Sequence, residues 1–117
     1  MGIAGLSWAS PLLPVKVLNE SGDGTYADVA EGLVYAAEQG AGVVNLSLGG
    51  YGYSQFLRDA VEHARSRGAV LVAAAGNDDS AEPMYPAAYP NVVAVVATGP
   101  ADQLWACLLY TSDAADE

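Results

Sequence analysis

The stretch VLVAAAGNDD, residues 70–79, decides the fold. Its apolar part, VLVAAA, is short for a helix, and it runs directly into Gly76, Asn77 and two aspartates. A continuous apolar run of this length is typical of a strand buried on both faces, as in a parallel sheet covered by helices. Ligands of open parallel sheets bind beyond the carboxyl ends of the strands. We therefore expect a functional site near residues 76–79.

The rest of the chain alternates strand and helix patterns. Thr25 followed by Asp28 predicts the start of a helix that ends at Gly40, and Ser54 predicts the start of a second helix that ends at Gly68. GGYGY (49–53) reads as a glycine-rich turn. The expected strands are LLPVKVL (12–18), VVNLSL (43–48), AVLVAAA (69–75) and NVVAVVAT (91–98).

This alternation predicts an α/β fold with three layers (αβα) and a mainly parallel sheet. The strand pattern stops near Thr98, so we expect the sheet to be incomplete. At 117 residues and 52% hydrophobic content, one globular domain is expected, over residues 1–106. The segment CLLYTSDAADE (107–117) changes character and resembles a translated sequencing adapter. We expect it to be a non-native tail, and an ordinary acidic tail is the alternative.

Charge and composition exclude several classes of partner and cofactor. The formal net charge is −10, so the chain has no basic surface for nucleic acid or anionic membranes. One cysteine, Cys107, and one histidine, His63, cannot form a zinc cluster. No apolar run reaches the ~18 residues of a membrane span. The first residues lack the basic region of a signal peptide.

Two motifs suggest a functional site, but an ordinary structural role is the better interpretation of each. Gly50, Gly52 and Ser54 suggest a phosphate-binding loop, but Gln55 occupies the third glycine position and no GK[ST] follows, which favours a simple turn. His63 lies inside the second helix, where no serine or cysteine is placed to use it as a base. An ordinary histidine is expected there.

Asn77 has two readings of similar weight. It can close an Asx-type turn at the strand end. Alternatively, its amide is a fixed hydrogen-bond donor aimed at developing negative charge. The small residues before it, Ala73 to Gly76, would leave room for a substrate backbone to approach.

The order of motifs resembles the subtilisin-like serine proteases (peptidase S8), particularly the thermitase-like branch. The matching segments cover nearly all of residues 2–103. They are GIAGLSWASPLLPVKVL (2–18), SGDGTYADVAEGLVYAA (21–37), VVNLSLGG (43–50), VLVAAAGND (70–78) and YPAAYPNVVAV (85–95).

The resemblance implies a role for each matching position, with polypeptide as the substrate. Asn77 would be the side-chain donor of the oxyanion hole. The implied substrate-binding residues are Ser47, Leu48 and Gly49, pairing with the substrate as a strand; Gly22 and Gly24, on its other side; Ala74, Ala75 and Gly76, lining the primary specificity pocket; and Tyr26 and Val29, bordering a second apolar pocket with Leu48.

The resemblance also implies a cis peptide bond at Tyr85-Pro86, and a weak monovalent- or calcium-ion site at the carbonyls of Ala87, Tyr89 and Val92. Secretion, and a propeptide in the intact parent, are further expectations from the family. No other cofactor is expected.

The catalytic motifs of the family, D-[ST]-G, HGTH and GTSMA, do not occur in this sequence. We therefore expect the chain to be a protease fragment that is inactive alone. The alternatives are a catalytically dead peptide-binding module and a nucleotide-binding α/β domain.

Overall fold

The computed structural model describes residues 4–78 and 80–101. The main sheet is parallel, with strand order β1-β3-β5, and β2 and β4 form a separate antiparallel pair. The elements are α1 (Tyr26–Glu38), β1 (Val43–Leu46), β2 (Gly50–Tyr51), α2 (Gln55–Ser66), β3 (Val70–Ala74), β4 (Met84–Tyr85) and β5 (Val93–Val95). The α/β class and the parallel sheet are confirmed.

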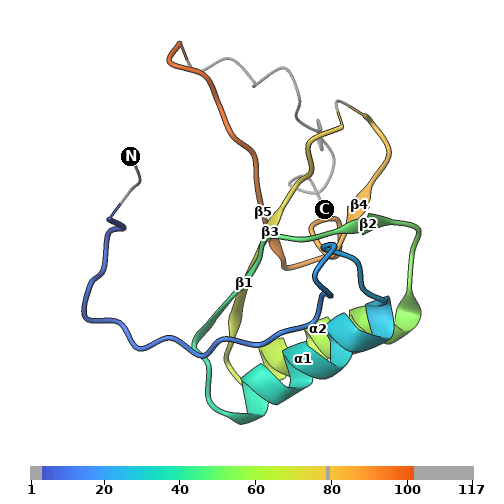
Figure 1. Cartoon of the computed structure of the whole chain (residues 1–117). Coiled ribbons are helices and arrows are strands. Elements are labelled where there is room, and N and C mark those ends of the chain that lie inside the picture. Colours follow the sequence, from blue (N-terminus) through green and yellow to red (C-terminus); the bar gives the residue numbers. More distant parts are fainter. Residues whose placement is uncertain (1–3, 79, 102–117) are drawn as a thin grey trace.

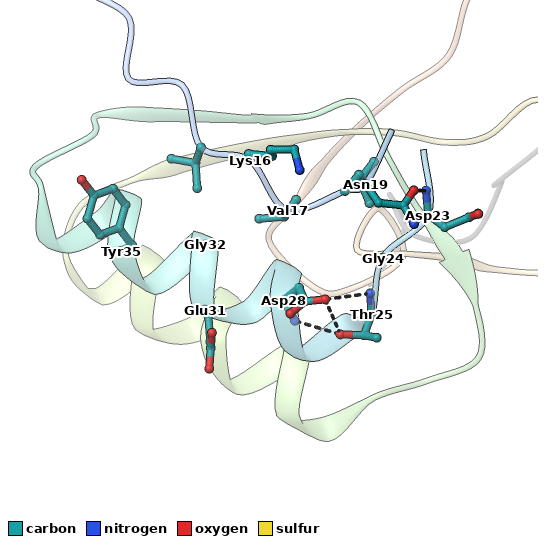
Figure 2. Close-up of a pocket in the computed structure, with 12 residues that line it drawn as sticks. Lys16, Val17, Asn19, Asp23, Gly24, Thr25, Asp28, Glu31, Gly32 and Tyr35 are labelled. Carbon is teal, nitrogen blue, oxygen red and sulfur yellow. Dashed lines mark hydrogen bonds between the residues drawn. The ribbon is translucent and has the colours of Figure 1, made fainter. Parts of the chain in front are cut away.

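Both helices begin at the expected caps. The Thr25 hydroxyl oxygen accepts from the Asp28 backbone N–H at 3.1 Å, and the Asp28 carboxylate accepts from the Thr25 N–H in return (Figure 2). At α2, the Ser54 hydroxyl accepts from the Leu57 N–H at 3.2 Å. These bonds satisfy backbone donors that a helix start otherwise leaves free.

The two helices cover the same face of the sheet. They run side by side below it (Figure 1), and their apolar stripes form one core with the sheet. Pairing of Leu46 with Ala73 and of Ala73 with Ala94 aligns the helix-facing positions of the three strands. That face carries Val44, Leu46, Leu71, Ala73 and Ala94.

The opposite face of the sheet is bare within residues 4–78 and 80–101. Val43 is 65% exposed, and Val70 and Val95 are about half exposed. The strands therefore differ from the expectation of burial on both faces, because the described helices form a single layer. We call this the valine face; its members are Val43, Asn45, Val70, Val72, Ala74, Val93 and Val95.

Two segments differ from the sequence prediction. Residues 12–18 belong to neither sheet, so the predicted strand is wrong there, because no described segment pairs with them. Part of the 49–53 turn is β2, which pairs with β4 in the register Gly50 to Tyr85. The Tyr85-Pro86 bond is cis, as expected. The predicted tail, 107–117, lies outside the described residues.

Candidate functional site

A groove of about 500 Å³ lies beyond the carboxyl end of β1. It brings together three of the predicted groups: Gly22 and Gly24 of the loop before α1, Tyr26 and Val29 of α1, and Ser47, Leu48 and Gly49 after β1. Leu48 is half-buried against the core, whereas Ser47 and Gly49 are exposed. The groove thus has an apolar floor and backbone groups along its rims.

Local packing explains two of the glycines in this groove. A Cβ at Gly24 would lie 2.6 Å from the Val17 carbonyl oxygen, and one at Gly49 would lie 2.7 Å from the Met84 sulfur. Real Cβ atoms essentially never approach that closely. The contact at Gly24 is with backbone, so packing alone requires glycine there, whereas the Met84 side chain could shift to admit a Cβ at Gly49. The presence of Gly24 is therefore not by itself a sign of substrate contact.

The predicted residues after β3 lie beside the groove and do not line it. The Ala75 N–H donates to the Val95 carbonyl at 3.0 Å, which keeps the chain in the sheet up to that residue. Gly76 has φ +114°, a conformation that favours glycine, and is buried. The chain turns out of the sheet there, and Asn77 is exposed. Because Leu46 pairs with Ala73, Ser47, directly after β1, lies level with Ala74, the last residue of β3.

Two tyrosines connect the groove to the segment after Gly76, and the sequence analysis missed this link. The Tyr26 hydroxyl donates to the Tyr51 carbonyl at 3.0 Å. The Tyr51 hydroxyl donates to the Asp78 carboxylate at 2.6 Å, across 27 positions of sequence. This hydrogen bond, more than burial, raises the pKa of Tyr51 to about 12. No local pattern marks the pair, because its members meet only in the fold.

The predicted cation site lies in a turn packed by aromatic rings. The rings of Tyr53, Tyr85 and Tyr89 contact one another with centroids 4.7–5.7 Å apart, in edge-to-face and tilted arrangements. The Tyr89 carbonyl accepts from the Val92 N–H at 3.3 Å, and Ala87 is fully buried. Carbonyl oxygens have two lone pairs, so this bond leaves room for a further contact. In the described part of the chain, no three His, Cys, Asp or Glu side chains gather as a metal site.

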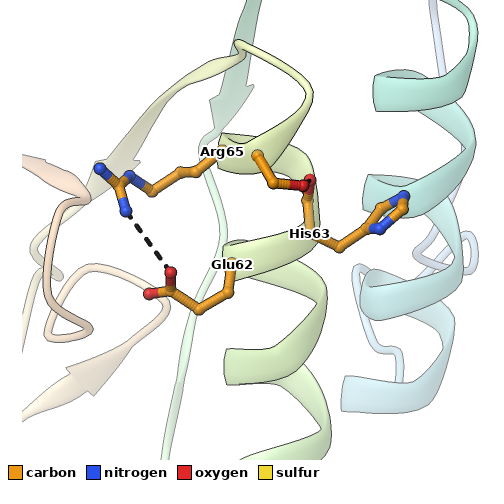
Figure 3. A network of polar contacts seen from close by, with 4 residues as sticks. Glu62, His63 and Arg65 are labelled. Atoms are coloured by element: carbon orange, nitrogen blue, oxygen red, sulfur yellow. Dashed lines mark hydrogen bonds and ion pairs between the residues drawn. The ribbon is translucent and has the colours of Figure 1, made fainter.

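His63 lies outside the groove, on the side of α2 that faces α1. Figure 3 shows its ring turned toward α1, away from the Glu62–Arg65 ion pair of 3.4 Å. Its Nε2 is 3.8 Å from the Glu38 carboxylate, too far for a hydrogen bond.

A second hollow, of about 790 Å³, lies between residues 15–19 and the first turns of α1 (Figure 2). It is lined by Lys16 and by the carboxylates of Asp23, Asp28 and Glu31. Asp28 is hydrogen-bonded to Thr25, and the hollow does not contain a predicted site residue other than Gly24.

Among the described residues, no helix has the length and hydropathy needed to cross a membrane.

Comparison with known proteins identifies relatives of one kind. A family model described as "Subtilase family" matches residues 1–110. Thermitase of Thermoactinomyces vulgaris is 50% identical over 97 residues, which cover 83% of this chain and 35% of thermitase. The thermophilic serine proteinase of Bacillus sp. (strain AK1) is 45% identical over 103 residues, covering 88% of this chain and 26% of that proteinase.

The chain is also similar to solved protease structures. Sphericase superimposes with a TM-score of 0.73 and 31% identity, over 80% of this chain and 34% of sphericase. The S41 psychrophilic protease has a TM-score of 0.65 and 37% identity, over 70% of this chain and 29% of its own. The chain therefore spans about a third or less of the length of these relatives.

Proposed function

Because the chain belongs to the subtilase family, we propose that it is the central part of a serine endopeptidase in which Asn77 stabilises the oxyanion. The relatives are proteases. One observation supports the assignment of Asn77. This residue is exposed shortly after β3, and the groove lies at the end of the neighbouring strand, β1.

Substrate polypeptide would lie in the groove as an extended strand. Ser47 and Gly49, and Gly22 and Gly24, line the groove, and their backbone groups would pair with the substrate strand on its two sides. Tyr26, Val29 and Leu48 would receive one apolar substrate side chain. Ala74 to Gly76 would line the pocket for the side chain next to the cleaved bond.

In the proposed reaction, a serine hydroxyl attacks the peptide carbonyl, a histidine takes its proton, and an aspartate orients that histidine. These three residues would be supplied by parts of the polypeptide outside this chain, since the sequence lacks their motifs. The role of Asn77 would be to donate its amide N–H to the carbonyl oxygen as negative charge develops there.

A thermitase chimera tests this proposal. The matched residues of thermitase are replaced by those of this chain, and peptide-ester hydrolysis is measured. We expect an active chimera in which Asn77→Ala lowers kcat by about 10²–10³-fold, a size known from the corresponding change in subtilisin. Gln39→Ala, which removes an exposed amide at the end of α1 outside the groove, is the control. An Asn77→Ala chimera with unchanged kcat would refute the assignment.

The 117-residue chain alone gives a second test. We expect no turnover of a peptide ester and no labelling by a serine-directed phosphonate, because oxyanion stabilisation without a nucleophile forms no acyl-enzyme. The flanking gene sequence distinguishes an active protease from the alternative, a catalytically dead binding module. Substituted D-[ST]-G, HGTH or GTSMA motifs there would favour that module.

Two family expectations remain proposals. We place a weak cation, monovalent or calcium, at the carbonyls of Ala87, Tyr89 and Val92, and a rise in Tm on adding calcium would support it. We also propose that the intact protein acts outside the cell.

A further inference from the structure

Asn77, the proposed oxyanion donor, follows a glycine that gives the backbone unusual freedom. β3 ends at Ala74, and the Ala75 N–H donates to the Val95 carbonyl at 3.0 Å, so the chain is fixed up to that residue. Gly76 then adopts φ +114°, in a region that glycine enters without steric cost. Neither Gly76 nor Asn77 makes a hydrogen bond to another described residue. An amide on such a turn needs a second attachment if it is to point in one direction.

The residue after Asn77 provides that second attachment. The Asp78 carboxylate accepts a hydrogen bond of 2.6 Å from the Tyr51 hydroxyl, the length expected when a hydroxyl donates to a carboxylate. Such bonds are stronger than those between neutral groups. Gly76 and Asn77 are therefore held between two points, the Val95 carbonyl before them and the Tyr51 hydroxyl after them.

Tyr51 is itself held by two other elements. It lies in β2, where it pairs with Met84 of β4. Its carbonyl accepts from the hydroxyl of Tyr26, in the first turn of α1, at 3.0 Å. The Tyr51 side chain also lines the candidate substrate groove. The contact with Asp78 thus starts from a backbone that is hydrogen-bonded on both sides, close to where a substrate would bind.

We propose that Tyr51 is a positioning residue for Asn77. Its hydroxyl holds the Asp78 carboxylate and thereby keeps residues 76–78 in the orientation that presents the Asn77 amide to the substrate carbonyl. A donor fixed in advance stabilises the oxyanion more than one that must reorient during the reaction. The inference rests on the proposed function, because Tyr51 has this role only if Asn77 is the oxyanion donor.

Backbone ¹⁵N relaxation on the 117-residue chain measures the tether without any catalysis. We expect order parameters near 0.85, about the rigid value, for Gly76 and Asn77 in the unmodified chain, and values below about 0.6 in Tyr51→Phe. Tyr35→Phe removes the hydroxyl of an exposed tyrosine on α1, outside the groove, and should leave both values unchanged. Ala75 should stay rigid in every variant, because its N–H is bonded within the sheet.

The thermitase chimera tests the consequence for catalysis. Tyr51→Phe should lower kcat about tenfold with KM nearly unchanged, because the donor is loosened and not removed, and its removal costs about 10²–10³-fold. In the Asn77→Ala chimera, Tyr51→Phe should have no further effect, since no donor is left to position. Equal losses of kcat in both backgrounds would indicate a merely structural role for Tyr51 and would overturn the inference.

Asp78 offers a matched pair of variants in the same chimera. Asp78→Asn and Asp78→Ala both remove the carboxylate charge, but only asparagine keeps an oxygen that can accept from the Tyr51 hydroxyl. We therefore expect kcat to be about tenfold higher for Asp78→Asn than for Asp78→Ala. Equal kcat values would show that the acceptor oxygen does not hold the turn, and they would contradict the positioning role.

The remaining outcomes separate this inference from the proposed function. Unchanged order parameters in Tyr51→Phe would show that its hydroxyl does not restrain the turn. A Tyr51→Phe chimera with unchanged kcat, beside an Asn77→Ala chimera that is slowed as expected, would refute the positioning role and leave the proposed function standing. An Asn77→Ala chimera with unchanged kcat would refute the proposed function, and this inference with it.

Discussion

Gly32, in the middle of α1, lies where the helix packs against the segment before it. Glycine is normally about 1 kcal/mol less favourable than alanine inside a helix. Here an alanine Cβ would overlap Val17, and overpacking of this kind costs about 1–3 kcal/mol. We therefore expect Gly32→Ala to lower the Tm. Glu31→Ala, an exposed neighbour in α1, is the control, and a Tm raised by Gly32→Ala would contradict the packing.

Tyr51 gives a prediction for pH dependence. Its hydrogen bond to Asp78 favours the neutral phenol and raises its pKa from 10.0 to about 12. The stability that this bond contributes is complete below pH 10 and is lost as the pH rises from 10 to 12. NMR titration of ¹³C-labelled tyrosine should show one ring ionising near pH 12, assigned by its loss in Tyr51→Phe.

The matched variants for this titration are Asp78→Ala and Glu31→Ala. Removing the Asp78 carboxylate removes the acceptor, so the Tyr51 pKa should fall toward 10. Removing the Glu31 carboxylate, on the exposed face of α1, should leave it unchanged. A Tyr51 ring that titrates near 10 in the unmodified chain would show that the bond to Asp78 does not persist in solution.

Single residues also show what the sequence could predict about the site. Asn77 could be proposed from the sequence because it follows a strand, and strand ends are visible as a change from apolar to polar residues. The sequence also indicated Gly22, Gly24 and Gly49, which line the groove, and the structure adds a packing reason for Gly24. Tyr51 and Asp78 were not identifiable as partners, because no periodicity relates residues on different elements.

At the scale of elements, Tyr89 fixes the start of α2. It is 2% exposed, and its hydroxyl accepts from the Ser54 N–H at 3.2 Å and donates to the Ser54 carbonyl at 2.7 Å. Tyr89→Phe would leave the part-buried Ser54 N–H without this partner, which costs about 1–3 kcal/mol. We expect a lower urea midpoint with an unchanged m-value.

Tyr53→Phe is the control for that measurement. Its ring contacts Tyr89 edge-to-face, and its exposed hydroxyl donates to Gln55 at 2.7 Å and accepts from Arg58 at 3.3 Å. Loss of these exposed hydrogen bonds should change the free energy of unfolding by about 0.5 kcal/mol or less. Equal effects of the two substitutions would mean that the Ser54 contact contributes nothing beyond the ring.

The helices were predictable to within two residues at each end because their caps are local: each start depends on a side chain within three positions of the bond that it makes. Residues 12–18 have a strand pattern but lie unpaired. A strand exists only with a partner, and its partner is not specified by its own sequence. The same reasoning explains β2, which was read as a turn and is a strand only because β4 lies opposite.

At the scale of the whole molecule, two forces act between copies of the chain. The net charge of −10 keeps them apart. The valine face, with Val43, Val70, Val93 and Val95 at least half exposed, draws them together, because contiguous apolar patches tend to become interfaces. The balance depends on ionic strength, since salt screens the charge and leaves the apolar attraction in place.

We therefore expect the 117-residue chain to self-associate as salt is raised. At about 1 M salt the screening length is about 3 Å, so repulsion between copies is almost removed. Sedimentation velocity should show a monomer at low salt and larger species at high salt. Val70→Thr with Val95→Thr keeps β-branched side chains in the strands but makes the face polar, and this variant should remain monomeric. Association that weakens with salt would be electrostatic in origin, and it would contradict the valine face as the contact surface.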